Sequence, residues 1–552
     1  MRALSFVVLG TLLAAAFAGC LDQTESQSNE ANRILRQGAG AKETLRISED
    51  WAELALMDER PPLHDHKNPA HHQNLTTPNF EVVGWDPLIT DYYGRTAGDH
   101  ACGDTKEKDG RRLSITHSFG TDVAFVIVDT TDPTEPKKIG ELVMSFTQVY
   151  DLALSPDLNW IVLATSPMDA GPGPEGGPVP PPLKSTYEEG DIMWRDACSG
   201  EEWPVPIMGP EAGLPFASGN VLVDISNPRA PNVADFVFYP PLGSHSITIT
   251  DMDGRMIALS SVPNIPDQAS FYAIMEITRA PTGTGKLLPL SIYQHPAAQT
   301  GPVATTEGMH DGLIAKHPGT NKWIAYLAHG ALGVVLLDVT NPAAPVYLSE
   351  WADFAGAVGD AAPTSAYVHE ALPAPDLWEG RHYTWIGEEC VGHPANTPTC
   401  LVFGLDTTDP TKPEFVGAWT LPIDVQWSQG LEWSLHYLAL MNRTLFVTAY
   451  HGGVWAVDVS TPEARATMPS IGVFIPANVS PKKFDTPPRG LIVQALYGGY
   501  ALDNTPTILD LNVASDGTLI VFDMHSGIYS VKFNDKFQAP PPEPWPLGPS
   551  NQ

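Results

Sequence analysis

The 552-residue sequence is poor in cysteine and in basic residues. It has five cysteines, and 31 lysines and arginines stand against 64 aspartates and glutamates. The formal charge of -33 argues against a nucleic-acid partner, because basic side chains hold phosphate backbones. It also argues against adsorption to an anionic lipid surface. We expect most of the carboxylates to form an ordinary solvated exterior.

Several catalytic signatures are also missing. The sequence has no GxSxG nucleophile elbow, no Walker phosphate loop, no GxGxxG turn opening a helix and no CxxC motif. Ser244 stands beside His245, but such neighbours are more often coincidental than a catalytic pair. Nucleophile, phosphate-loop and dinucleotide chemistry therefore have little support in the sequence.

The composition favours strands and turns. Hydrophobic residues make up 43% and charged residues 17%, with 53 prolines and 47 glycines. A chain of this length exceeds a single ordinary core, so it forms either several domains or one repeat architecture. We expect an all-β protein in which long helices are scarce.

The N-terminus has the pattern of an export signal. Residues 1–20 carry one arginine, an apolar stretch from Leu4 to Phe17 and the ending Ala-Phe-Ala-Gly-Cys at Cys20. The apolar stretch is too short for a convincing membrane span, so we expect a lipoprotein signal peptide and a lipidated Cys20. An ordinary signal peptide with an incidental cysteine is the alternative. We expect an exported protein, periplasmic or on the cell surface, that contacts the membrane only through this lipid anchor.

The other four cysteines are an even number in a chain expected to be exported, which favours disulfides. We expect Cys390 to pair with Cys400 across one loop. That pairing leaves Cys102 with Cys198.

A three-stranded unit repeats along the chain. Its clearest copy is Leu435 to Pro462, with apolar runs at 437–440, 445–450 and 454–459. Gap-free alignment matches it to stretches that begin at Val149, Gly243 and Ile508. The three remaining units carry insertions and span Gly98 to Ser118, Gly308 to Gly330 and Tyr367 to Glu389.

The ends of the chain complement each other. Phe80 to Trp85 reads as a fourth strand that precedes any complete unit, whereas the last unit, Ile508 to Phe533, stops after its third strand. The early strand can therefore complete the late unit and close a ring. Seven units of this kind predict a seven-bladed β-propeller closed by pairing of the N-terminal strand with the C-terminal blade.

The third strands share an ending, for example FVIVDTTDPTEP from Phe125 and VVLLDVTNPAAP from Val334. These endings resemble the LVIVD repeat family of exported bacterial and archaeal propellers, and the resemblance covers residues 80 to 535. It implies a scaffold and leaves the function open, because a fold does not define an activity.

The expected domain organisation follows from these boundaries. Residues 21–78 are a polar tether, 79–535 form the propeller with an insert at 167–219, and 536–552 are a Pro-rich tail. A second long insert, Pro476 to Pro506, lies between the sixth and seventh units. The tether holds four closely spaced histidines, which suit either metal contact or a flexible polar linker: His64, His66, His71 and His72.

Histidines recur at two positions of the repeat. At the start of the first strand the seven units carry His100, Asp151, His245, His310, His369, His436 and Asp510. At the end of the second strand they carry His117, Ser166, Ser260, His329, Glu388 or Glu389, His451 and His525. Antiparallel pairing puts both positions at one end of each blade, so both rings are expected at the same mouth of the channel.

Nine histidines around one axis predict a metal site, because neutral imidazoles bind copper, zinc, iron or nickel. Each histidine taken alone is better explained as a polar side chain bonded to backbone or water. The absence of cysteines from both rings favours copper over structural zinc. We expect nearby carboxylates to orient the imidazoles: Asp151, Asp311, Glu370, Glu388 and Asp510.

Two families offer comparisons for such a ring. Nitrous oxide reductases and the copper-dependent methanethiol oxidases of the selenium-binding family are similar in idea. This chain departs from both, because Asp151 and Asp510 occupy two ring places and no cupredoxin domain follows. The sequence thus predicts a copper-dependent oxidoreductase for a small molecule that enters the funnel, with an external electron carrier. The alternative is a non-catalytic surface binding or adhesion propeller.

Overall fold

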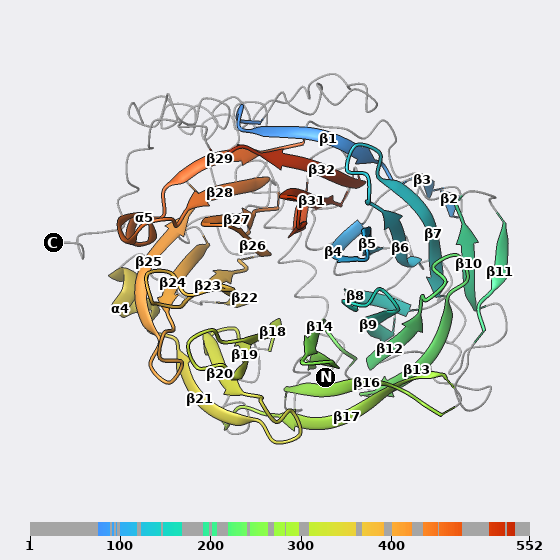
Figure 1. The fold of residues 1–552 in the computed structure, drawn as a ribbon, viewed down its shortest axis with the longest axis horizontal. Coiled ribbons are helices and arrows are strands. Elements are labelled where there is room, and N and C mark those ends of the chain that lie inside the picture. Colours follow the sequence, from blue (N-terminus) through green and yellow to red (C-terminus); the bar gives the residue numbers. More distant parts are fainter. Residues whose placement is uncertain are drawn as a thin grey trace, which may run out of the picture.

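The computed structural model confirms the seven-bladed β-propeller (Figure 1). It describes residues 76–88, 91–92, 95–96, 100–118, 123–144, 147–167, 191–197, 201–206, 219–239, 243–262, 270–281, 283–296, 309–359, 367–390, 400–421, 434–450, 452–476, 507–524 and 527–535. Seven antiparallel sheets surround one axis, and the first strand of each lies nearest to it. No helix within these ranges is long and apolar enough to cross a membrane.

The first four blades follow the chain in order. Blade 1 contains β4 (His100–Lys108), β5 (Arg111–Ser118), β6 (Val123–Asp129) and β7 (Lys137–Met144). Blade 2 contains β8 (Thr147–Leu154), β9 (Trp160–Pro167), β12 (Gly219–Asp224) and β13 (Asn232–Phe238). Blade 3 contains β14 (Ser246–Met252), β15 (Arg255–Val262), β16 (Phe271–Arg279) and β17 (Gly285–Tyr293). Blade 4 contains β18 (Gly312–Lys316), β19 (Trp323–Ala328), β20 (Val334–Asp338) and β21 (Val346–Trp351).

The remaining blades close the circle. Blade 5 contains β22 (Val368–Pro373), β23 (Tyr383–Glu388), β24 (Leu401–Asp406) and β25 (Glu414–Thr420). Blade 6 contains β26 (Leu438–Met441), β27 (Thr444–Thr448), β28 (Val454–Asp458) and β29 (Ser470–Phe474). Blade 7 contains β30 (Ile508–Val513), β31 (Thr518–Asp523), β32 (Gly527–Phe533) and β1 (Phe80–Asp86). The described elements also include two short helices, α4 (Phe354–Val358) and α5 (Pro462–Thr467), and a small hairpin of β2 (Asp91–Tyr92) and β3 (Arg95–Thr96).

The N-terminal strand closes the ring as expected. β1 pairs antiparallel with β32, so strands from both ends of the chain share blade 7 (Figure 1). Just before β1, the Thr77 backbone N–H donates to the Val473 carbonyl at 2.9 Å, and the Asn79 side chain donates to the Ile471 carbonyl at 2.8 Å. The Thr76 hydroxyl, three residues before the expected boundary at 79, also donates to the Ile475 carbonyl at 3.2 Å. These contacts tie the entering chain to blade 6 as well as to blade 7.

The aspartate at the end of the third strand explains the repeated sequence ending. In five blades its carboxylate accepts a hydrogen bond from the backbone N–H two residues later, at 2.8 to 3.0 Å. These aspartates are Asp129, Asp224, Asp338, Asp406 and Asp458. In four blades the second Asp or Asn of the motif makes the same turn three residues on. The motif therefore encodes two successive side-chain-stabilised turns that send the chain to the outer strand.

The hydrophobic core lies between neighbouring blades. Leu113 and Ile127 of blade 1, for example, share one buried cluster with Val149 and Leu163 of blade 2. Alternate residues of a strand pack against the blade before and the blade after it. A strand that is buried on both faces therefore has a nearly continuous apolar sequence.

The insert at 167–219 adds to a blade other than its own. It leaves blade 2 after β9, and β10 (Ile192–Asp196) and β11 (Glu202–Pro204) extend blade 1 beyond β7. Gly140 on β7 lies against Trp194, and a Cβ there would fall 2.3 Å from the indole ring. The insert thereby links blades 1 and 2 across their outer edges.

One of the two expected disulfides is present. Cys390 and Cys400 are bonded, with Cα atoms 5.8 Å apart. The predicted Cys102–Cys198 pair is wrong, because Cys102 is a buried free thiol on β4. Cys198 itself lies outside the described residues.

Candidate metal centre

Four histidines from consecutive blades form a row at the channel mouth. They are His245, His310, His369 and His436, at the starts of the innermost strands of blades 3 to 6. Neighbouring ring centroids lie 4.4, 4.0 and 3.9 Å apart along the row. The vertical alignment of repeats therefore predicted this half of the ring correctly.

Strand pairing corrects the other half of that ring. The pairing of first and second strands shows which residues of the seven innermost strands are equivalent. The residues equivalent to these histidines, here called the histidine level, are in blade order Ala101, Tyr150, His245, His310, His369, His436 and Leu509. His100 lies one residue before this level, and Asp151 and Asp510 lie one residue after it. The prediction slipped because the hairpins between first and second strands differ in length, which a gap-free alignment of repeats ignores.

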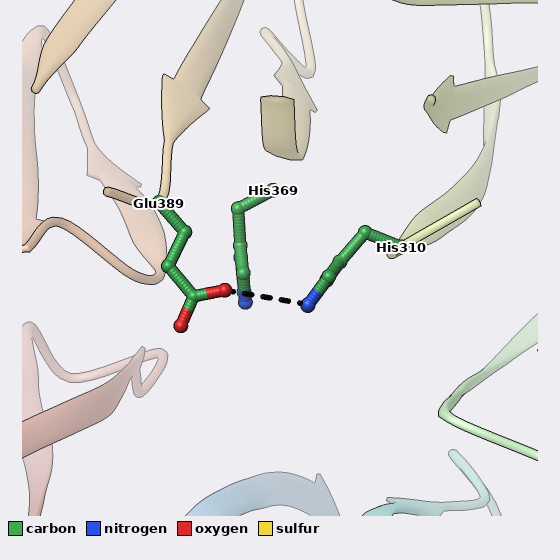
Figure 2. A group of neighbouring side chains, drawn as sticks. All are labelled: His310, His369 and Glu389. Carbon is green, nitrogen blue, oxygen red and sulfur yellow. Dashed lines mark ion pairs between the residues drawn. The ribbon is translucent and has the colours of Figure 1, made fainter. Parts of the chain in front are cut away.

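Donor atoms of three of the four histidines, His310, His369 and His436, lie close to one carboxylate. The ligand atoms of His310, His369 and Glu389 all lie within 4.8 Å of one another (Figure 2). Glu389 Oε2 is 3.5 Å from His310 Nε2, and Glu389 Oε1 is 3.8 Å from His436 Nε2. His245 Nε2 lies 2.9 Å from His310 Nε2. Two nitrogens on one tetrahedral metal, each about 2.0 Å from it, would lie about 3.3 Å apart, so these spacings approach a ligand set.

Burial keeps the four imidazoles neutral. It lowers the pKa of His245 to about 4 and that of His436 to about 3. Burial, together with the neighbouring imidazoles, also holds the pKa values of His310 and His369 well below the ordinary range. Each ring can therefore offer a nitrogen lone pair at neutral pH.

Hydrogen bonding leaves Nε2 of His436 available as a ligand. Nδ1 of His436 lies 3.0 Å from the Leu509 carbonyl, so it carries the proton and Nε2 carries the lone pair. His369 is fully buried, yet neither of its ring nitrogens has a hydrogen-bond partner among the described residues. An unpaired buried polar group costs about 1–3 kcal/mol, and a metal ion would relieve that cost.

Glu389 is held from three directions. The Tyr450 hydroxyl donates to Glu389 Oε1 at 2.6 Å, and the Glu389 backbone N–H donates to the Tyr367 carbonyl at 2.9 Å. The next residue is Cys390, which the disulfide fixes. Burial raises the pKa of Glu389 to about 7, while the hydrogen bond from Tyr450 opposes this rise. Neither Tyr450 nor the choice of Glu389 over Glu388 was predicted.

The carboxylates expected to orient the imidazoles join blades instead. They lie one residue below the histidine level, where the blades carry Cys102, Asp151, Ser246, Asp311, Glu370, Tyr437 and Asp510. Asp151 accepts from the Ile247 backbone N–H at 2.9 Å, Glu370 from Leu438, and Asp510 from Gly103 at 2.9 Å. Each bond runs from one innermost strand to that of the next blade.

Burial governs the charge of this carboxylate layer. It raises the pKa of Asp311 to about 6, and the pKa values of Asp151, Glu370 and Asp510 rise well above the ordinary range for the same reason. Burial also raises the pKa of the Cys102 thiol, helped by the carboxyl groups of Asp151 and Asp510. Glu388 faces away from the centre and accepts from the Leu401 backbone N–H at 2.9 Å.

The second predicted ring is not formed by its described members. Strand pairing places His117 level with Ala328 and not with His329. The His329 ring lies 5.5 Å from that of His295, whose Nε2 is 2.8 Å from Glu350 Oε2. His451 and His525 lie outside the described residues, as do His64, His66, His71 and His72, and of His100 only the backbone is described.

Comparison with known proteins adds no argument about this chain. No family model matches the sequence, and no curated protein matches it. Among solved structures, the chain is similar to the β-propeller domain of Cps50 (Swd1) from Myceliophteria thermophila. The TM-score is 0.38 at 9% identity, over 79% of this chain and 98% of that one. A likeness this distant carries no functional argument, and the resemblance to the LVIVD repeat family stays a prediction from the strand endings.

Proposed function

We propose that His245, His310, His369, His436 and Glu389 bind a transition metal at the mouth of the propeller, and that the protein is a copper-dependent oxidoreductase for a small molecule. The observation that carries the proposal is the convergence of His310, His369 and Glu389, whose donor atoms lie within 4.8 Å of one another. The buried ring of His369, without hydrogen-bond partners among the described residues, adds support.

The donor set favours copper among the available metals. Imidazole suits copper, zinc, iron and nickel, and Cu²⁺ binds most tightly of the divalent first-row ions at a given nitrogen and oxygen site. Cys102, a free thiol on the innermost strand of blade 1, lies one level below the histidines. Zinc and iron are the competitors, because one carboxylate among imidazoles suits them as well.

A redox role needs a source of electrons. Bound copper would supply one-electron chemistry, and the described residues include one group of side chains that could hold a metal ion. We therefore propose an external electron carrier that docks at the channel mouth. The reacting small molecule would reach the metal from the same side.

Metal analysis tests the proposal directly. Protein should be loaded separately with copper, zinc and iron, freed of excess metal, and assayed for bound metal per chain. We expect stoichiometric copper in the wild type, with nitrogen hyperfine structure in its electron paramagnetic resonance spectrum. Its loss is expected in His310→Ala and His436→Ala, whereas His295→Ala should retain copper. A wild-type protein that retains none of the three metals would leave only a binding or adhesion propeller.

We also propose that the chain is exported and anchored through Cys20. The support is the apolar stretch that ends in Ala-Phe-Ala-Gly-Cys. Expression with labelled palmitate should label the wild type and not Cys20→Ser. An unlabelled wild type would contradict the anchor without affecting the metal centre.

A further inference from the structure

The histidine level of the channel is chemically one-sided. Blades 3 to 6 contribute imidazoles, whereas blades 7, 1 and 2 contribute Leu509, Ala101 and Tyr150. Glu389 follows the second strand of blade 5, on the same side as the histidines. All proposed ligands therefore approach a metal from one half of the ring, and any open coordination position faces the other half.

The half without histidines is apolar and buried. Ala101 is 0% exposed and Leu509 1%, and both belong to one hydrophobic cluster with Met524 and Tyr450. We call Ala101, Leu509 and Met524 the apolar wall. The wall adjoins the ligand set, because the Leu509 carbonyl accepts the hydrogen bond from His436 Nδ1 and Tyr450 donates to Glu389. On the far side, the Tyr150 ring lies 5.3 Å from that of His245.

Within the two described levels of the channel, no basic side chain offers a counter-charge for an anion. The fourteen positions at the histidine level and the level below it include neither lysine nor arginine. Four of the seven positions in the lower layer are carboxyl groups. An anionic ligand would have to leave water for a site where only the metal could balance its charge. An uncharged ligand avoids that cost.

We infer that the external ligand of this centre is a small uncharged molecule, which reaches the metal from the side of blades 7, 1 and 2. The inference rests on the proposed metal centre and names the class of molecule that the centre accepts. An anionic ligand is disfavoured because no basic side chain balances its charge. A bulky ligand is disfavoured because larger side chains, Leu509 and Tyr150, stand on either side of Ala101, the smallest residue of the apolar wall.

Two small probes, one uncharged and one anionic, test this inference. Carbon monoxide binds Cu(I) and is followed by its infrared stretching band, and azide binds Cu(II) and is followed by its charge-transfer absorption. We expect carbon monoxide to bind the reduced copper protein. Millimolar azide should leave the spectrum of the oxidised protein unchanged.

Substitution in the apolar wall supplies the second measurement. Ala101→Leu should lower carbon monoxide affinity at least tenfold with copper content unchanged. The matched control is Ala234→Leu, an equal enlargement of a buried alanine on the outer strand of blade 2, which should bind carbon monoxide as the wild type does. Leu509→Phe repeats the test if Ala101→Leu does not fold.

The outcomes separate the two claims. Wild-type protein that holds no copper overturns the metal centre and this inference with it. Protein that holds copper overturns the inference alone if azide binds as readily as carbon monoxide. The inference alone is also overturned if Ala101→Leu or Leu509→Phe folds, binds copper and keeps the wild-type affinity for carbon monoxide.

Discussion

The Tyr450 hydroxyl donates a 2.6 Å hydrogen bond to Oε1 of Glu389 and so orients the carboxylate that lies beside His310 and His369. The bond favours the ionised carboxylate and opposes the rise that burial causes in its pKa. Tyr450→Phe should therefore raise that pKa further and weaken copper binding about tenfold, within the range seen for residues that support metal ligands. Competition with a chelator of known affinity at pH 7 measures the change.

The control for this substitution is another buried tyrosine. The Tyr326 side chain is fully buried and its hydroxyl has no hydrogen-bond partner among the described residues. Tyr326→Phe should leave copper affinity unchanged. An equal effect of the two substitutions would show that Tyr450 acts through general packing and not through Glu389.

His369 gives a test that combines stability with metal binding. Its buried nitrogens lack partners among the described side chains and backbone, so His369→Leu should stabilise the metal-free protein by about 1 kcal/mol. Copper should raise the unfolding temperature of the wild type and not that of the variant, because a ligand stabilises only the state that it binds. Calorimetry with and without copper measures both effects. A less stable metal-free variant would show that His369 has a packing role instead.

The fold could be predicted because the repeat has a local physical cause. Asp338 and its equivalents turn the chain in the same way in blade after blade, so the endings are visible in sequence even where loop lengths vary. The closure of the ring was also predictable, because Phe80 to Trp85 is a strand that belongs to no repeat unit of its own, and the last unit lacks its fourth strand. The addition of β10 to blade 1 was not, because nothing local tells an insert which sheet edge it will meet.

The candidate site was only half predictable. His310, His369 and His436 were found because each lies at the start of the first strand of its unit, but Asp151 and Asp510 were misplaced by one residue. Strand register depends on hairpin length, which the repeats do not share: Leu438 pairs with Val447, whereas Gly312 pairs with Leu327. The role of Tyr450 depends on a contact 61 residues away in sequence, for which the repeat pattern holds no signal.

His329 predicts a pH dependence of stability away from the centre. Burial lowers its pKa from an ordinary 6.5 to about 4, helped by the neighbouring His295. As the pH falls, the unfolded chain binds a proton at this residue before the folded one does. Its contribution is therefore complete above about pH 6.5 and is lost towards pH 4, with about 3 kcal/mol at stake. Denaturant unfolding at several pH values measures this slope.

The variant His329→Phe should show a shallower loss of stability between pH 6.5 and 4 than the wild type. Tyr326→Phe keeps the histidine and should retain the wild-type slope. Identical slopes for wild type and His329→Phe would assign the acid sensitivity to other groups.

Closure of the ring should depend on the first described strand. Phe80 on β1 is 1% exposed, and its ring lies 4.8 Å from that of Phe533, 6.2 Å from Phe446 and 6.3 Å from Phe474. Phe80→Ala should lower the free energy of unfolding by about 3–5 kcal/mol, as for other large-to-small changes in a core. Phe415→Ala, at a ring 37% exposed on blade 5, should cost less. Equal costs in denaturant unfolding would mean that β1 contributes little to closure.

The disulfide should act on the metal through Glu389. Glu388 accepts from the Leu401 backbone N–H at 2.9 Å, the Cys390 backbone N–H donates to Ser434 Oγ at 2.8 Å, and Cys390 is bonded to Cys400, so both neighbours of Glu389 are fixed. Replacing both cysteines by serine should weaken copper binding about tenfold, because the carboxylate loses its fixed position. Chelator competition measures the affinity, and Cys102→Ser, at a free thiol, is the matched control.

A double-mutant cycle decides whether the effect passes through the carboxylate. Glu389→Gln should weaken copper binding by itself, and removal of the disulfide from that variant should then change the affinity little, because coupled residues are not additive. If the disulfide acts instead on the histidines or on the stability of blade 5, the losses in copper affinity from Glu389→Gln and from removal of the disulfide should add. Affinities of the four proteins, measured on samples that unfold cooperatively, distinguish the two cases.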